Sequence, residues 1–271
     1  MDPDVHQLAA LFRNISTQLR GTLSNFHLAA GQLVPAADRE LNPILDAKAA
    51  VLDQGYYQLL RLVNDLSAVS SLYAGPPLLL QDCDIVELIR TLCLQADDLA
   101  AMIGLKLQFL CNLDRHICAV NRDSIEQLLF HLLSNAFKFT PAGGSVSVEL
   151  KISGNRVLLS VCDTGCGIDE HLLPVLFDRY LHEISEEPLP GQGLGLGLFL
   201  CHRIAEAHGG SIMAESRAGK GTRFTVSLPD RQAGSPSVSD VPNAYSNGFN
   251  KILMALSDAL PSSAFLLRNQ D

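Results

Sequence analysis

The first quarter of the chain repeats apolar residues at intervals of three and four, the spacing that places side chains along one side of an α-helix. One such stripe extends from Asp4 to Leu33 and stops before Pro35. A second starts at Asn42-Pro43, where asparagine can act as N-cap and proline as the first helical residue, and it stops before Gly75-Pro76-Pro77. The pattern predicts a helical hairpin over residues 1–77.

Both stripes are narrow, so two antiparallel helices cannot bury them well as a lone hairpin. A four-helix bundle made by two chains would bury both stripes, and packing against the chain's own second domain is the alternative. We expect a homodimer through the helical hairpin.

Residues 78–229 mix helical periodicity with the two-residue alternation of strands. Asp84 and Glu87 have the spacing of a capping box, which predicts a helix that ends at Gly104. We expect strands at residues 105–109, 117–120, 146–152, 156–161, 211–215 and 222–228, and helices through residues 125–133 and 196–208. The fold class is therefore α+β: a helical hairpin followed by a two-layer α/β sandwich, with helices over one face of a mixed sheet.

Residues 230–271 form a third part. Residues 230–249 are rich in Ser, Pro, Gly and Asn, which is typical of a linker. A short amphipathic helix is expected after it, with Ile252, Leu253, Leu256, Ala259 and Leu260 on its apolar side. We expect this helix to dock on the chain's own body, and binding to a partner is the alternative.

The composition is globular, since 47% of the 271 residues are hydrophobic and 18% are charged. A net charge of −9 argues against nucleic acid as a partner, so a bound polyanion needs a local positive site. The seven cysteines include no C-x-x-C pair and are expected to be reduced and mostly buried. With neither a secretion signal nor an apolar run of the ~20 residues that span a bilayer, we expect a soluble, cytoplasmic protein without a transmembrane segment.

Asn135 and Lys138 lie one helical turn apart. An amide oxygen can ligate Mg²⁺ that phosphates already neutralise, and an ammonium group can hold a phosphate oxygen. Alone this pair is a weak indication, because many helices carry both residue types.

Asp163 ends an apolar strand and is followed at once by Gly165 and Gly167. Glycine permits close backbone approach, and a carboxylate at the end of a sheet can accept a hydrogen bond from the exocyclic amine of adenine. A simple Asp-Gly turn is the alternative.

Residues 191–198 alternate glycine with other residues and run into the helix expected at 196–208. Exposed backbone N–H groups and a helix N-terminus suit phosphate. The loop does not open a first βαβ unit, as a Rossmann fingerprint would, and it lacks the Gly-Lys-Ser/Thr of a P-loop.

In this order, the three segments resemble the Bergerat-type ATP-binding domain shared by histidine kinases, gyrase, the large heat-shock chaperone and mismatch-repair ATPases. The resemblance is closest to histidine kinases and extends over residues 8–228. The matching segments are an asparagine box at 131–141, a first glycine box at 163–168, a phenylalanine box at 176–180, a second glycine box at 193–198 and a closing segment at 219–226.

The resemblance implies ATP and Mg²⁺ as cofactors. It assigns Mg²⁺ to Asn135, a phosphate to Lys138, and adenine to Asp163 with Thr222 beside it. Gly165 and Gly167 would shape the adenine side, and Phe177 with the segment through Gly197 would form a mobile lid. The expected catalytic set is His131, Asn135 and Lys138, and the nucleotide set further includes Gly193, Gly195, Gly197 and Leu198.

The first helix departs from the family pattern. Where histidine kinases typically read Ile-Ser-His-Glu-Leu-Arg-Thr-Pro-Leu, residues 15–23 read Ile-Ser-Thr-Gln-Leu-Arg-Gly-Thr-Leu. Thr17 therefore stands at the phosphoacceptor position, and Gln18 replaces the acidic neighbour. A threonine hydroxyl is a poor nucleophile without a base, so ordinary autophosphorylation is not expected here. His6 and His27 are weaker acceptor candidates, each more typical of a surface histidine.

We expect an ATP-binding, histidine-kinase-like protein of a two-component phosphorelay, with a response regulator or another signalling protein as partner. A non-catalytic, ATP-responsive dimeric regulator is the main alternative. A serine/threonine kinase acting on a partner protein is less favoured, because the helical hairpin fits the first two functions better. An ATP-hydrolysing clamp is also less favoured, because those enzymes resemble one another in a glutamate base at the position of His131.

Overall fold

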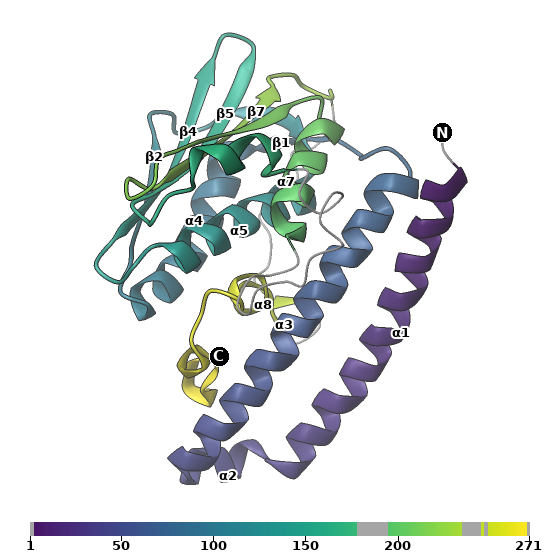
Figure 1. Ribbon diagram of the computed structural model, residues 1–271, viewed down its shortest axis with the longest axis vertical. Helices are drawn as coiled ribbons and strands as arrows, with labels where there is room; N and C mark the ends of the chain where they lie inside the picture. The colour runs from purple at the N-terminus through teal and green to yellow at the C-terminus, as the bar shows by residue number, and fades with distance from the viewer. Residues whose placement is uncertain (1–2, 178–194, 235–244, 247–248, 270–271) are drawn as a thin grey trace. The chain divides into compact units, whose positions relative to one another are not determined.

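The computed structural model describes residues 3–177, 195–234, 245–246 and 249–269 (Figure 1). The chain divides into two compact units. The helical unit comprises residues 1–76 and 245–271, and the α/β unit comprises residues 77–244.

The helical unit is built on two long helices, α1 (Pro3–Leu33) and α3 (Pro43–Ala74), which pack side by side (Figure 1). The Asn42 side chain accepts hydrogen bonds from the backbone N–H groups of Ile44 and Leu45, so it is the N-cap that the sequence predicts. A short helix that was not expected, α2 (Ala36–Leu41), fills the turn between them.

The C-terminal residues belong to the helical unit. They form the two-residue strands β8 (Tyr245–Ser246) and β9 (Phe249–Asn250), helix α8 (Lys251–Leu256), and the 3₁₀ turns η2 (Ser262–Phe265) and η3 (Leu267–Asn269). Helix α8 and turn η2 pack on α3, so the amphipathic segment docks on the chain's own body, as expected.

The α/β unit contains a five-stranded sheet in the order β2-β4-β5-β7-β6. Strand β2 runs parallel to β4 and the other neighbours are antiparallel, so the sheet is mixed, as predicted. Helices α4, α5 and α7 lie on one face of it (Figure 1). The elements are β1 (Gln81–Asp84), α4 (Ile85–Met102), β2 (Lys106–Cys111), β3 (Ile117–Val120), α5 (Arg122–Phe139), β4 (Ser145–Ser153), β5 (Arg156–Asp163), η1 (Glu170–Val175), α7 (Leu196–Ala207), β6 (Ser211–Ser216) and β7 (Thr222–Pro229).

The core of this unit lies between the sheet and the helices. Along β4, Val146, Val148 and Leu150 are fully buried, while Glu149 between them faces the other side of the sheet. Among the residues that the structure describes, helices cover only this one face, as predicted. Glu149 forms ion pairs with Lys151 and Arg223 on the open face, and these two cations hold the pKa of its carboxyl below the usual range.

The two ends of the α/β unit are hydrogen-bonded to each other. The Asp82 carboxylate in β1 accepts from the backbone N–H of Ala233 at 2.7 Å. The Ala119 N–H in β3, which pairs with β1, donates to the carbonyl of Arg231 at 2.7 Å. The incoming and outgoing segments of this unit therefore lie side by side.

The seven cysteines are all free, and four of them are buried. Burial raises the pKa of Cys93 and Cys118 to about 12, so these thiols stay protonated. Within the described ranges, no helix combines the length and apolar character needed to span a membrane.

Candidate nucleotide-binding site

Helix α5 carries the first candidate residues. Its N-terminus is capped by Asn121, whose side chain accepts from the Ser124 N–H at 3.0 Å. Toward its other end, Asn135 is half-buried and Lys138 is exposed, with the ammonium group 5.7 Å from the centre of the Phe139 ring. The two side chains share one side of the helix, one turn apart.

Asp163, at the end of β5, joins two of the predicted motifs. Its Oδ1 accepts from the Gly165 N–H at 2.9 Å and from the Thr222 N–H at 3.1 Å. Burial raises the pKa of Asp163, and these two N–H groups oppose that rise. Both described hydrogen bonds fall on Oδ1, and neither falls on Oδ2.

The glycines after Asp163 allow a close fit between α5 and the turn before β7. A Cβ on Gly165 would collide with the carbonyl oxygen of Phe139, the last residue of α5. Gly167 has a φ of 71°, and a Cβ there would collide with the carbonyl of Arg217. The backbone of Cys166 bonds to both neighbours: its N–H donates to Phe139 and its carbonyl accepts from the Gly219 N–H.

Ser216 completes this side of the site, although the sequence did not single it out. Its hydroxyl lies 2.9 Å from the Thr222 hydroxyl and accepts from the Ile168 N–H at 2.8 Å. Ser216 and Thr222 are paired residues of β6 and β7. Strand alternation from buried Ile212 could have identified Ser216 as a residue of the covered face.

Helix α7 brings the second glycine box against the asparagine box. Gly195 precedes the helix with a φ of 70°, a left-handed conformation that favours glycine. A Cβ on Gly197 would lie 3.1 Å from Nδ1 of His131 in α5, so the glycine allows the two helices to approach at this point. Leu198 follows and is half-buried.

Phe177 lies against α7 and the sheet. Its ring centre is 5.8 Å from that of His202 and 6.3 Å from that of Phe224. Gly193 and the remainder of the expected lid, residues 178–194, fall outside the described residues, so the lid and the contact with Gly193 stay predictions.

A hollow of about 400 Å³ lies at the ends of β5, β6 and β7. Its lining includes Cys162, Glu215 and Arg223. These residues pair across the strands and, by alternation, face away from the helices. Asp163, Ser216 and Thr222 also line this hollow, so it adjoins the place where the motif residues meet. We assign no nucleotide to it, because its other strand residues face away from the helices.

The described residues contain no group of three or more His, Cys, Asp or Glu side chains that could hold a metal. Mg²⁺ commonly binds proteins through only one or two ligands together with phosphates and water. Asn135 on its own therefore fits Mg²⁺ only as part of a metal–nucleotide complex.

Thr17 is exposed on α1, and its hydroxyl donates to the carbonyl of Arg13 at 2.9 Å. Its proton is thus directed at a backbone oxygen rather than at a base. His27 stacks on Tyr56 with ring centres 4.2 Å apart, which is unlike a freely exposed acceptor. The side chain of His6 falls outside the described residues.

The fold and the converging motifs define a Bergerat-type ATP-binding domain. Residues 120–232 match the family described as histidine kinase-, DNA gyrase B- and HSP90-like ATPase. Sensor protein SrrB of Staphylococcus aureus (strain N315) is 32% identical over 218 residues, which are 80% of this chain and 37% of SrrB.

Two solved structures are also similar. Full-length ShkA, crystallised in complex with AMPPNP, is 28% identical with a TM-score of 0.65 over 88% of this chain and 48% of ShkA. The histidine kinase AdeS of Acinetobacter baumannii shares the fold at 20% identity, with a TM-score of 0.51 over 66% of this chain and 84% of AdeS. The chain is thus similar to histidine kinases over most of its length, and it spans 37% of the length of SrrB.

Proposed function

We propose that this chain is an ATP-binding signalling protein of the histidine kinase class that works in a two-component system. The observation that carries the proposal is the Asp163 carboxylate, which joins the first glycine box to the closing segment through the N–H groups of Gly165 and Thr222. In this proposal Oδ2 of Asp163 accepts from the adenine amine, and Asn135 and Lys138 hold Mg²⁺ and phosphate. The AMPPNP in the ShkA structure supports a nucleoside triphosphate as the ligand.

The acceptor region favours a second candidate, an ATP-responsive regulator without autophosphorylation. Thr17 has a hydroxyl committed to the Arg13 carbonyl, and Gln18 provides no carboxylate beside it. Signal output would then depend on nucleotide binding, or on phosphoryl transfer to an acceptor outside this position. A response regulator or another signalling protein is the partner that either mechanism implies.

We also propose a homodimer through the hairpin. Apolar side chains stay exposed along one side of the two long helices, with exposed fractions of 37–53%: Leu11, Ile15, Leu19 and Phe26 on α1, and Leu52 and Leu59 on α3. A second copy would remove this stripe from water in a four-helix bundle. In this proposal residues 1–77 are the dimerisation part and residues 78–229 the ATP-binding part, while residues 245–271 belong to the same compact unit as the hairpin.

Incubation with γ-labelled ATP tests the two candidates. The unmodified chain is expected to bind ATP without acid-labile label on α1, whereas the double variant Thr17→His/Gln18→Glu is expected to gain such label. The matched control adds Asp163→Asn to the double variant and is expected to lose the label with the nucleotide. A double variant that binds ATP but stays unlabelled would argue for the regulator, and a chain that does not bind ATP would refute both candidates.

A further inference from the structure

The C-terminal segment meets one flank of α3 through its own backbone. The Gln54 side-chain amide donates to the carbonyl of Leu260 at 2.8 Å, and that of Gln58 donates to the carbonyl of Ser257 at 3.2 Å. Ser257 is the C-cap residue of α8, and Leu260 lies in the stretch that follows the helix. Helix α3 therefore supplies hydrogen-bond donors to backbone carbonyls at and after the end of α8.

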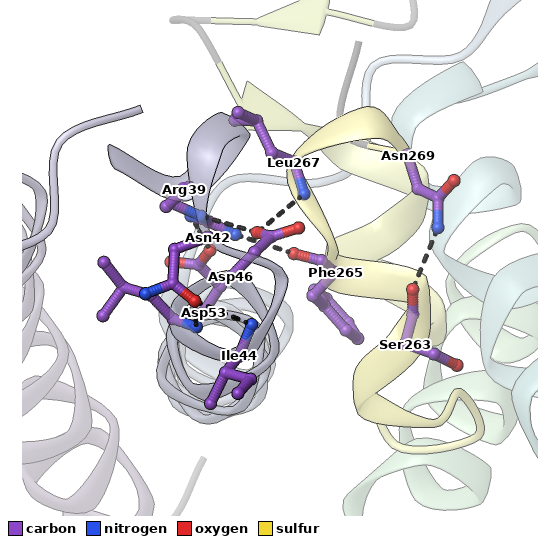
Figure 2. Close-up of polar contacts among 10 residues, drawn as sticks. Arg39, Asn42, Ile44, Asp46, Asp53, Ser263, Phe265, Leu267 and Asn269 are labelled. Carbon is purple, nitrogen blue, oxygen red and sulfur yellow. Dashed lines mark hydrogen bonds and ion pairs between the residues drawn. The ribbon is translucent and has the colours of Figure 1, made fainter. Parts of the chain in front are cut away.

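Arg39 makes the same kind of contact further along the segment (Figure 2). Its guanidinium is 9% exposed and donates to the carbonyl of Phe265 at 3.2 Å. Asp46 and Asp53 hold the guanidinium in place at 2.8 and 2.7 Å. Asp46 also accepts from the backbone N–H of Leu267 at 3.2 Å. Arg39 and Asp46 together therefore form hydrogen bonds with both a carbonyl and an N–H of the segment.

The apolar side of the segment is deeply buried. Leu253, Leu256 and Phe265 are 0% exposed, and the Phe265 ring lies 5.6 Å from that of Tyr57 on α3. A helix as short as α8 is not stable alone in water, so the segment must gain its order from α3. Its contacts thus have the form of a short amphipathic helix and turn bound to a preformed helix.

This flank is separate from the apolar stripe proposed for dimerisation. The residues that contact the segment, such as Asp46, Gln54 and Tyr57, lie on one side of α3. Leu52 and Leu59 share another side and remain 47% and 50% exposed with the segment in place. The two surfaces can therefore be occupied independently.

We propose that this flank of α3 is a docking surface for a short amphipathic helix that ends in a turn, and that residues 251–269 occupy it in cis as an exchangeable ligand. Gln54, Gln58 and Arg39 donate to backbone carbonyls of the segment, which any peptide of that shape presents. Arg61 and Asn64 also contact two of its side chains, those of Asp258 and Met254. The segment is joined to the rest of the chain through residues 235–244, and so short a tether gives it a high effective concentration. A trans ligand of the same kind must compete with it.

The test uses the full chain with a site for a specific protease introduced within residues 235–244. A fluorescein-labelled synthetic peptide of residues 249–271 is added before and after cleavage, and its anisotropy is measured as the cleaved chain is diluted. The uncut chain is expected to exclude the peptide. The cut chain is expected to take it up, because its own fragment no longer benefits from the tether.

Two variants and one control examine the contacts. Arg39→Met in the cut chain is expected to lower the affinity for the labelled peptide about tenfold, since a hydrogen bond from a charged donor is lost. Gln54→Ala, which removes a neutral donor and leaves no buried charge, is expected to lower this affinity about fivefold. Lys48→Ala, at an exposed position of the same helix, is expected to leave binding unchanged.

Two results would overturn the proposal. One is a cut chain that never exchanges its fragment and loses cooperative thermal unfolding when the fragment is removed, which would make the segment part of the permanent core. The other is peptide binding that neither Arg39→Met nor Gln54→Ala alters, which would place the peptide elsewhere.

Discussion

Replacing Asp163 separates the structural and nucleotide-binding roles of its carboxyl group. Asp163→Asn keeps an amide oxygen that can accept from the N–H groups of Gly165 and Thr222, but it removes the negative charge. Asp163→Ala removes the acceptor for both N–H groups. At ~0.5–1.5 kcal/mol for each hydrogen bond, the alanine variant is expected to lose about 1–3 kcal/mol of the free energy of unfolding.

The direction of the stability change in Asp163→Asn follows from the direction of the pKa shift of Asp163. Burial raises the pKa of Asp163 in the folded state, so the native state disfavours the charge at neutral pH. The stability associated with a raised carboxyl pKa is present at acidic pH and is lost as the pH rises through the folded-state pKa. Asp163→Asn is therefore expected to be at least as stable as the parent chain at pH 7, and this advantage disappears at acidic pH.

Nucleotide binding should respond in the opposite way. An ionised carboxylate can accept from the adenine amine, and losing a contact worth ~1.4 kcal/mol weakens binding about tenfold. The parent chain is expected to bind ATP less tightly as the pH falls through the raised pKa of Asp163, whereas Asp163→Asn shows a flat profile. Urea unfolding and titration with a fluorescent ATP analogue measure the two effects. Equal stability losses for asparagine and alanine, or an asparagine variant with full ATP affinity, would refute the reasoning.

Three further predictions concern other parts of the chain. His208 is buried between a backbone carbonyl in α7 and the backbone N–H just before α5, and burial lowers its pKa. The parent chain should therefore lose stability as the pH falls below the unfolded-state pKa of histidine, and His208→Gln should lose less, measured as the free energy of unfolding against pH. Gly165→Ala should cost about 2 kcal/mol or more by thermal unfolding, because its Cβ meets backbone, whereas Gly21→Ala, with nothing within 4 Å, should stabilise α1 slightly. Leu19→Glu should dissociate the proposed dimer in analytical ultracentrifugation, whereas Thr17→Glu, on an exposed position of the same helix, should not; a dimer that withstands Leu19→Glu would contradict the bundle.

Most of the fold could be predicted from periodicity. The caps at Asn42 and Asp84 and the alternation along β4 each carry a local signal strong enough to locate an element. Strand β1 was missed because its residues 81–84, Gln-Asp-Cys-Asp, show no apolar alternation, and the strand is stabilised by pairing with β3. Helix α2 was missed because it has only the length of a turn.

The site could be predicted only as a set of motifs. Sequence order places Asp163 and Gly165 in one segment and Thr222 in another, and only the folded chain joins the two segments through hydrogen bonds to one oxygen. Ser216 was missed because strand alternation indicates which face it lies on but not what it contacts. Its role depends on pairing with Thr222, which is a long-range property of the sheet.

The hydrogen bond that joins Asp82 to Ala233 has a consequence for how such a chain is assembled. When the first and last residues of an inserted domain lie close together, a short peptide could replace the domain without displacing the segments on either side. The helices and their C-terminal segment could thus have acquired the ATP-binding module as a single cassette, and could exchange it for another whose ends are equally close.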